Sequence, residues 1–198
     1  MRILHLLTLV AVIAAPLALH ATQITYTETF VGSGSVTNGN FTEQFSNQLV
    51  TLTGVGDTDN VVNQSSGLFI NIVPTTFSVA GGLGGAFADE IQFVSNQGLG
   101  VGGVGDNTTD AAVMFTTNSA FNTYDLTTAF GPVTGAPIFN AGAHFGTTSG
   151  AFSIDSAGDS TFQATTGASP VPEPSSLILL GTGALGVLGV MKRKLLAA

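Results

Sequence analysis

A two-residue alternation of apolar and polar side chains between residues 22 and 170 constrains the fold of this chain most. The segment ITYTETF, residues 24–30, places Ile24, Tyr26 and Phe30 on one face and its threonines on the other. Since successive side chains of a β-strand point to opposite sides, this alternation predicts a strand with one buried face. No part of this region has a sustained helical period, so an all-β fold is expected.

The same alternation recurs along the region and predicts about ten strands. Phenylalanines supply most of the expected aromatic core, because the chain has 14 Phe, 2 Tyr and no Trp. Clusters of Gly, Asn and Asp between the strands are typical of turns. We therefore expect one antiparallel β-sandwich, jelly-roll-like, over residues 22–168. The further strand segments are LFINIV (68–73), TFSVA (76–80), FADEIQFV (87–94), AVMFTT (112–117), AFSID (151–155), NFTEQF (40–45), QLVTLT (48–53), FNTYDLT (121–127) and STFQATT (160–166), and the turn clusters are GSGS (32–35), GVGDTDN (54–60), GGLGG (81–85) and GVGDNTTD (103–110).

Charge is distributed very unevenly. All four basic residues, Arg2, Lys192, Arg193 and Lys194, lie in the terminal segments, while eleven of the twelve carboxylates lie between residues 22 and 170. Phosphate binding depends on Lys and Arg, so the charge pattern excludes nucleic acid as a partner. Basic residues at both ends also prefer the cytoplasmic side of a membrane, which leaves the acidic domain outside the inner membrane.

The first 21 residues have the features of a secretory signal peptide. Arg2 gives a short positive region, an apolar run follows to Leu19, and Ala21 is a small residue at the expected cleavage site. An uncleaved amino-terminal anchor is the alternative. The chain has no cysteine, which excludes a lipidated amino terminus and disulfide bonds.

The last residues combine a Pro-Glu-Pro triplet, an uncharged run and a basic end. Pro172, Glu173 and Pro174 belong to a linker over residues 169–174. Residues 175–191 carry no charge, and as a helix they would span roughly 25 Å, enough for a short transmembrane helix. Lys192, Arg193 and Lys194 open the tail 192–198, predicted to be cytoplasmic, and would hold the helix end in the headgroups.

This tail resembles the PEP-CTERM sorting signal of Gram-negative bacteria. The resemblance rests on residues 171–174 as the motif, residues 175–191 as the helix and residues 192–194 as the basic end. It implies export, temporary anchoring in the inner membrane by the helix, and recognition of the triplet by an exosortase-type processing enzyme. Proteins of this kind accompany exopolysaccharide and biofilm systems, which implies a final place at the cell surface or outside the cell. The domain is also similar to uncharacterised ectodomains of such proteins, and this likeness implies no activity.

An enzymatic role is not expected for the domain. The domain has one histidine, His144, which could act as a general base. The sequence contains no G-x-S-x-G segment with a serine nucleophile and no cysteine nucleophile. One histidine with carboxylates is a poor ligand set for zinc. A glycosidase pair among the eleven carboxylates stays open, although Asp89 and Glu90 would point to opposite faces of a strand.

Two Gly-rich segments carry oxygen donors suited to calcium. Carboxylate and amide oxygens are the ligands that Ca²⁺ requires, yet Asp and Asn also favour turns. Neither segment completes a known calcium loop. Calcium therefore remains an alternative to turn formation, and no other cofactor is expected. The candidate ligands are Asp57, Asp59, Asn60, Asp106, Asn107 and Asp110, with Asp155 and Asp159 as a looser pair.

Three roles follow for the exported domain. The first is a non-catalytic surface or extracellular-matrix protein. The second is a carbohydrate-binding module, with or without calcium, that holds an exopolysaccharide. The absence of Trp and the strand positions of Tyr26 and Tyr124 favour the first, because sugar sites usually stack on exposed aromatic rings. Assembly through uncharged strand edges is a third role, opposed by the repulsion of the carboxylates.

Overall fold

The computed structural model describes residues 22–167 except Ser66. Within them the chain forms twelve β-strands and two short 3₁₀ helices, η1 (Thr58–Asn60) and η2 (Ser119–Thr123). The all-β prediction is confirmed for this part of the chain. The strands are β1 (Gln23–Asn38), β2 (Phe41–Asp57), β3 (Val62–Ser65), β4 (Leu68–Ile72), β5 (Thr75–Val79), β6 (Gly84–Ala86), β7 (Ile91–Asn96), β8 (Val101–Asp106), β9 (Ala112–Thr117), β10 (Phe130–Ile138), β11 (Phe145–Thr147) and β12 (Gly150–Thr166).

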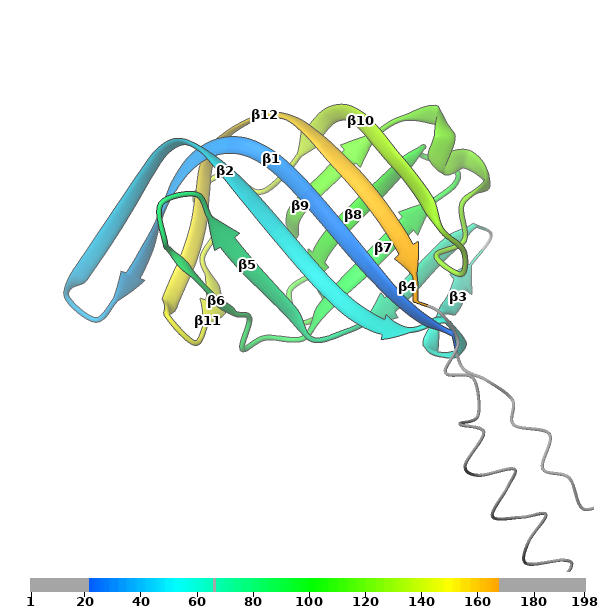
Figure 1. Ribbon diagram of the computed structural model, residues 1–198, viewed down its shortest axis with the longest axis horizontal. Coiled ribbons are helices and arrows are strands. Elements are labelled where there is room, and N and C mark those ends of the chain that lie inside the picture. The colour runs from blue at the N-terminus through cyan, green and yellow to red at the C-terminus, as the bar shows by residue number, and fades with distance from the viewer. Residues whose placement is uncertain (1–21, 66, 168–198) are drawn as a thin grey trace, which may run out of the picture. The chain divides into compact units, whose positions relative to one another are not determined.

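All pairings between these strands are antiparallel, and they join the strands into one continuous sheet. The hydrogen-bonded order is β3-β4-β7-β8-β9-β10-β12-β1-β2-β5-β6, with β11 pairing β12 beside this path. Six of the ten neighbouring pairs are consecutive in the chain, and the other four are β4-β7, β10-β12, β12-β1 and β2-β5. The first strand, β1, therefore lies between β2 and the last strand, β12. Figure 1 shows β12, β1 and β2 as long strands that run together across the front of the domain.

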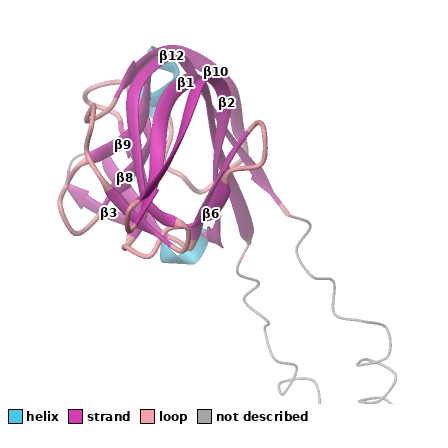
Figure 2. Cartoon of the chain, turned by 90° about the vertical axis from the view of Figure 1, so that its left-hand side faces the viewer, coloured by secondary structure: helices cyan, strands magenta, loops and turns pink. Residues whose placement is uncertain are grey.

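The sheet curls into two facing layers, which Figure 2 shows from the side. Strand β10 belongs to both layers, because Thr134 pairs with Thr161 of β12 while Pro137 pairs with Thr116 of β9. The expectation of a sandwich is therefore met in its layering and corrected in its connectivity. One curled sheet replaces two separate ones, and crossovers in the chain make β2 a neighbour of β5 and β4 a neighbour of β7.

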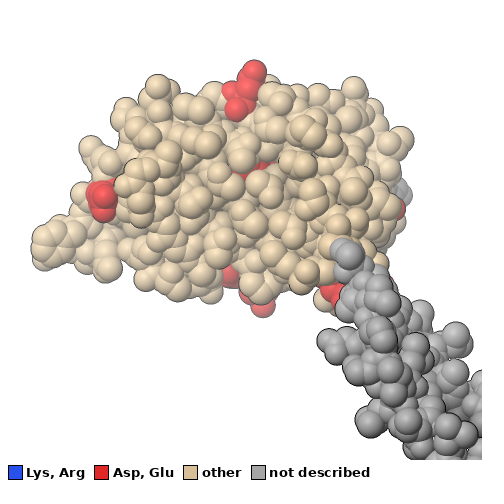
Figure 3. All heavy atoms as spheres, viewed as in Figure 1, with Lys and Arg blue, Asp and Glu red and all other residues tan. Residues whose placement is uncertain are grey.

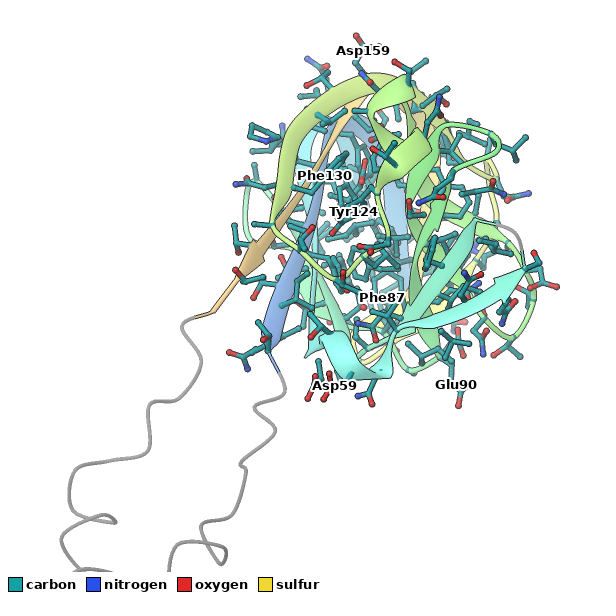
Figure 4. All side chains as sticks on the ribbon, turned by 90° about the vertical axis from the view of Figure 1, so that its right-hand side faces the viewer. Asp59, Phe87, Glu90, Tyr124, Phe130 and Asp159 are labelled. Atoms are coloured by element: carbon teal, nitrogen blue, oxygen red, sulfur yellow. The ribbon has the colours of Figure 1, made fainter. Side chains whose placement is uncertain are left out.

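Aromatic rings fill the space between the layers. Tyr26 stacks on Phe93 with ring centroids 4.8 Å apart, and Tyr124 stacks on Phe130 at 4.0 Å. Phe162 packs against both pairs. Tyr124 and Phe130 point into this interior in Figure 4. Buried aromatic pairs in such offset and tilted arrangements contribute beyond the area that they bury, so this cluster supplies much of the stability of the domain.

The GSGS segment, predicted as a turn, lies inside β1. Gly32 and Gly34 adjoin irregularities in the pairing of β1 with β12. A Cβ on Gly34 would approach the Ser153 carbonyl oxygen to 2.1 Å, and one on Gly32 would approach that of Ser156 to 2.6 Å. The glycines are therefore required where two strands bend and their backbones approach closely, which is the second common use of glycine besides turns.

The FNTYDLT segment, predicted as a strand, instead forms η2 and a loop. Its backbone oxygens are satisfied by side chains of neighbouring strands. The carbonyl oxygen of Tyr124 accepts hydrogen bonds from Ser95 Oγ (2.8 Å) and Gln97 Nε2 (3.2 Å), and that of Leu126 accepts one from Tyr26 Oη (2.7 Å). Side-chain partners replace a strand partner here, which alternation of residue types alone cannot indicate.

Candidate functional site

The predicted sorting and membrane segments lie outside the residues that the structure describes. These are the signal peptide 1–21, the triplet Pro172, Glu173 and Pro174 with its linker, the helix 175–191 and the basic residues 192–194. Across residues 22–167, Ser66 aside, no helix has the length and hydropathy required to span a membrane. The structure therefore bears on the ectodomain and on the candidate residues within it.

The first candidate calcium segment ends β2 and forms η1. Asp57 is the residue before η1, and its Oδ1 accepts a hydrogen bond from the Asp59 amide at 2.9 Å. Asp59 and Asn60 are exposed, and Figure 4 shows Asp59 at the lower edge of the domain. The Asp57 carboxylate thus acts as a helix cap, one of the turn roles expected for Asp.

The second candidate segment follows β8 and also forms a turn. Asp106 is buried, and its carboxylate accepts hydrogen bonds from the Thr108 amide (2.7 Å), the Thr109 amide (3.3 Å) and Thr109 Oγ1 (2.9 Å). The Asn107 side chain donates to Glu90 Oε2 at 3.1 Å, and Asp110 takes a positive φ of 56°. The amides and hydroxyl of this turn already occupy the Asp106 oxygens.

The candidate calcium ligands do not gather into one site in the described part of the chain. No group of three or more His, Asp or Glu side chains there has the arrangement to hold a metal ion. The tetrapeptides 54–57 and 103–106 end strands β2 and β8, which pair with different neighbours. Calcium binding at these residues stays a prediction from the sequence, and the turn interpretation accounts for the contacts of Asp57 and Asp106.

Two of the residues considered for catalysis, Ser149 and Asp89, make hydrogen bonds to the backbone. His144 is exposed next to β11. Ser149 Oγ donates a hydrogen bond to the Gly84 carbonyl oxygen at 2.6 Å, and the Asp89 carboxylate accepts one from the Gly146 amide at 2.7 Å. The side chains of Ser149 and Asp89 thus stabilise the junction of β6, β11 and β12.

Glu28 is a buried carboxyl that the sequence interpretation left out of the core. It lies on the inward face of β1 between Tyr26 and Phe30, and it is fully buried. Thr116 Oγ1 of β9 donates a hydrogen bond to Glu28 Oε1 at 2.5 Å, and Ser160 Oγ lies 2.6 Å from Thr116 Oγ1. Burial raises the pKa of Glu28 to about 8, against smaller lowering effects of its hydrogen bonds to Thr116 and Ser160.

A second buried polar network joins the two layers. Asn71 Nδ2 donates to Tyr26 Oη at 3.0 Å and to the Asp57 carbonyl oxygen at 3.1 Å. Burial raises the pKa of Tyr26 to about 12, the hydrogen bond from Asn71 lowers it, and Asp125 raises it slightly. The phenol therefore stays neutral at physiological pH. The network ties β1, β4 and the loop after η2 together.

The outer face of the front layer carries rows of hydroxyl groups. One row crosses five strands in register, since Thr134 pairs with Thr161, Thr161 with Thr29, Thr29 with Thr51, and Thr51 with Ser78. These side chains point outward because their sequence neighbours, such as Phe77 and Phe162, are buried. We call this surface the threonine face; its next two rows are Gln163, Thr27, Thr53 and Thr76, and then Thr165, Thr25 and Val55.

Comparison with known proteins gives one match, in the tail. Residues 170–194 match the family described as the PEP-CTERM protein-sorting motif. The tail of the chain carries a PEP-CTERM sorting motif. This confirms the resemblance drawn from the triplet, the uncharged run and the basic end. No curated protein and no solved structure matches the chain.

The match establishes the coarse biology of this chain. The signal implies that the protein is exported, that its carboxy-terminal segment anchors it in the membrane before processing, and that exosortase-type machinery sorts it. The match covers the tail alone, so the role of the ectodomain has to be argued from its own surface and core.

Proposed function

We propose that this chain is a non-catalytic surface or extracellular-matrix protein, delivered as a folded β domain and released or displayed after processing of its tail. The sorting motif at residues 170–194 carries this proposal. Further support comes from the ectodomain itself, where the buried side chains of Glu28 and Asn71 bond to other groups of the core and are closed off from solvent.

The absence of an enzymatic role belongs to the same proposal. The side chains with catalytic chemistry that the sequence offered are engaged in strand junctions and turns, as the contacts of Asp89, Asp106 and Ser149 illustrate. His144 is exposed. An association with biofilm or exopolysaccharide fits this proposal. A carbohydrate-binding module is the second candidate, and the hydroxyl rows of the threonine face favour it.

The test replaces Pro172, Glu173 and Pro174 together by alanine in the full chain. The triplet is the part of the tail that a processing enzyme can recognise by sequence, so its loss should leave a longer species that stays with the membrane. Immunoblots of membrane, surface and medium fractions, made with an antibody to the ectodomain, measure both size and location.

A matched control replaces Thr166, Gly167 and Ser169 by alanine, three positions that precede the matched motif. The control should be processed and located like the wild type. The proposal is wrong if the triplet variant has the same size and location as the wild type.

A further inference from the structure

The threonine face is a broad surface without charge in its rows, and exposed Asp159 lies at its border, two residues before Thr161 on β12. Its three rows contain hydroxyl, amide and apolar side chains and no carboxylate. Figure 3 shows this side of the molecule as largely uncharged, with acidic groups mostly near its outline. In a region with eleven carboxylates and no Lys or Arg, such a surface selects against acidic partners.

The hydroxyl groups of the face are ordered and partly free. Thr134 Oγ1 and Thr161 Oγ1 are 2.8 Å apart and share a hydrogen bond. Within residues 22–167, Ser66 aside, the hydroxyls of Thr27, Thr51 and Thr53 make no side-chain hydrogen bond as donors. They remain available to a partner, and the β-branched side chains hold them in few rotamers, which lowers the entropic cost of binding.

Apolar side chains border the hydroxyl rows on two sides. Val31 and Leu49 pair beside the first row and are 44% and 50% exposed, and Val55 in the third row is 43% exposed. The face therefore offers hydroxyl groups in its middle and aliphatic contacts along its borders. Sugar rings present the same combination of hydroxyl groups and C–H surfaces.

From this surface we propose that the threonine face binds a neutral, extended polysaccharide chain. The first row crosses five strands, a length of roughly 19 Å at the usual spacing between strands. A polymer lying along it meets a hydroxyl group at every strand. Acidic polymers are disfavoured because the surrounding carboxylates repel them. This inference adds a binding partner to the proposed function. It rests on the proposed function, because the protein must reach the cell surface or the matrix to meet a polysaccharide.

Two other occupants fit the face less well. A second copy of the chain brings its own unbalanced carboxylates, and no basic residue of the region can offset them. A flat crystal such as ice requires a flat array, whereas adjacent strands twist by about 20–25°, which accumulates to roughly 80–100° over five strands. A flexible chain can follow that twist.

The experiment uses the full chain in a detergent without sugar groups. Affinity electrophoresis measures its binding to hydroxyethylcellulose and dextran as neutral polymers and to alginate as an acidic one. The test variant carries Thr27→Val, Thr51→Val and Thr53→Val, which remove three hydroxyls and keep the shape and β-propensity of the side chains. Thr37→Val and Thr42→Val, on the exposed part of the β1–β2 hairpin, form the matched control.

We expect the wild type and the control to bind a neutral polymer more tightly than alginate. The test variant should bind it roughly tenfold or more weakly, since three hydrogen bonds are lost. The proposal is overturned if the wild type binds neither neutral polymer, if alginate binds more tightly, or if the test variant binds as well as the control. Inhibition of ice growth without polymer binding would show that the threonine face binds ice, and this result would also overturn the proposal. None of these results changes the outcome of the sorting test, so the two proposals fail separately.

Discussion

At the scale of single residues, Glu28 is the side chain whose chemistry depends most on its surroundings. It is fully buried, and no basic residue exists in residues 22–170 to pair with it. Its Oε2 has no hydrogen-bond partner among the described residues. An ionised carboxylate in such a place is costly, so the folded domain favours the protonated form.

This burial predicts that the ectodomain becomes less stable as pH rises. The unfolded chain releases the Glu28 proton near its ordinary pKa of 4.5, whereas the folded chain holds it to about 8. The stabilisation is fully present below the lower value and is lost as pH rises to the upper one, a change on the order of 5 kcal/mol. Urea unfolding of segment 22–167 across this range measures the loss.

Glu28→Gln should remove most of this pH dependence, because the amide does not ionise. Glu43→Gln is the control, since Glu43 is exposed on β2 and should leave the slope unchanged. A wild-type stability that stays level or rises through this range would contradict the burial of an unpaired Glu28 carboxyl.

The position of Glu28 could have been predicted from the sequence, since it shares the parity of Ile24, Tyr26 and Phe30 in ITYTETF. The alternation indicates an inward side chain at residue 28, and the charge of glutamate argued against it. The partner Thr116 could not be predicted, because it lies 88 residues away and reaches Glu28 through the curl of the sheet.

At the scale of elements, glycine decides where the strands bend and approach each other. Sequence analysis identified β9 with its observed bounds, all of β4, most of β5 and the two ends of β12, where alternation is regular. It misassigned GSGS because glycine marks a turn in most sequences. Register is set by pairings far apart in the chain, such as Thr29 with Thr161, and no local pattern shows them. The rows of the threonine face could not be predicted from the sequence for this reason.

Gly54 gives a direct test of such close approach. It is buried on β2, and a Cβ there would lie 2.3 Å from a ring carbon of Phe93 and 2.6 Å from a methyl carbon of Val73. Gly54→Ala should therefore lower the free energy of unfolding by about 1–3 kcal/mol through overpacking. Thermal unfolding measures the change.

Gly98→Ala is the matched control for this substitution. Gly98 is exposed in the loop before β8, and its nearest contact would be Asn96 Oδ1 at 3.5 Å, an ordinary distance. Equal stability of the two variants would show that β2 and β7 do not approach as closely as the structure has them.

At the scale of the whole molecule, the chain combines a carboxy-terminal sorting signal with a folded β domain. The sorting signal could be predicted from the triplet, the uncharged run and the basic end, because sorting enzymes and membranes recognise short local patterns. The domain could be predicted as all-β and antiparallel, since alternation is also local. Its single curled sheet, its buried Glu28 and its threonine face depend on contacts between distant segments, which one sequence does not show.

The central claim is that this domain leaves the cytoplasm and is separated from its tail. The most direct measurement is the intact mass of the ectodomain species recovered from the cell-surface and medium fractions. The account predicts a species that begins near Thr22 and ends near the triplet Pro172, Glu173 and Pro174. Recovery of the intact chain of 198 residues from the cytoplasmic fraction, with none outside, would contradict it.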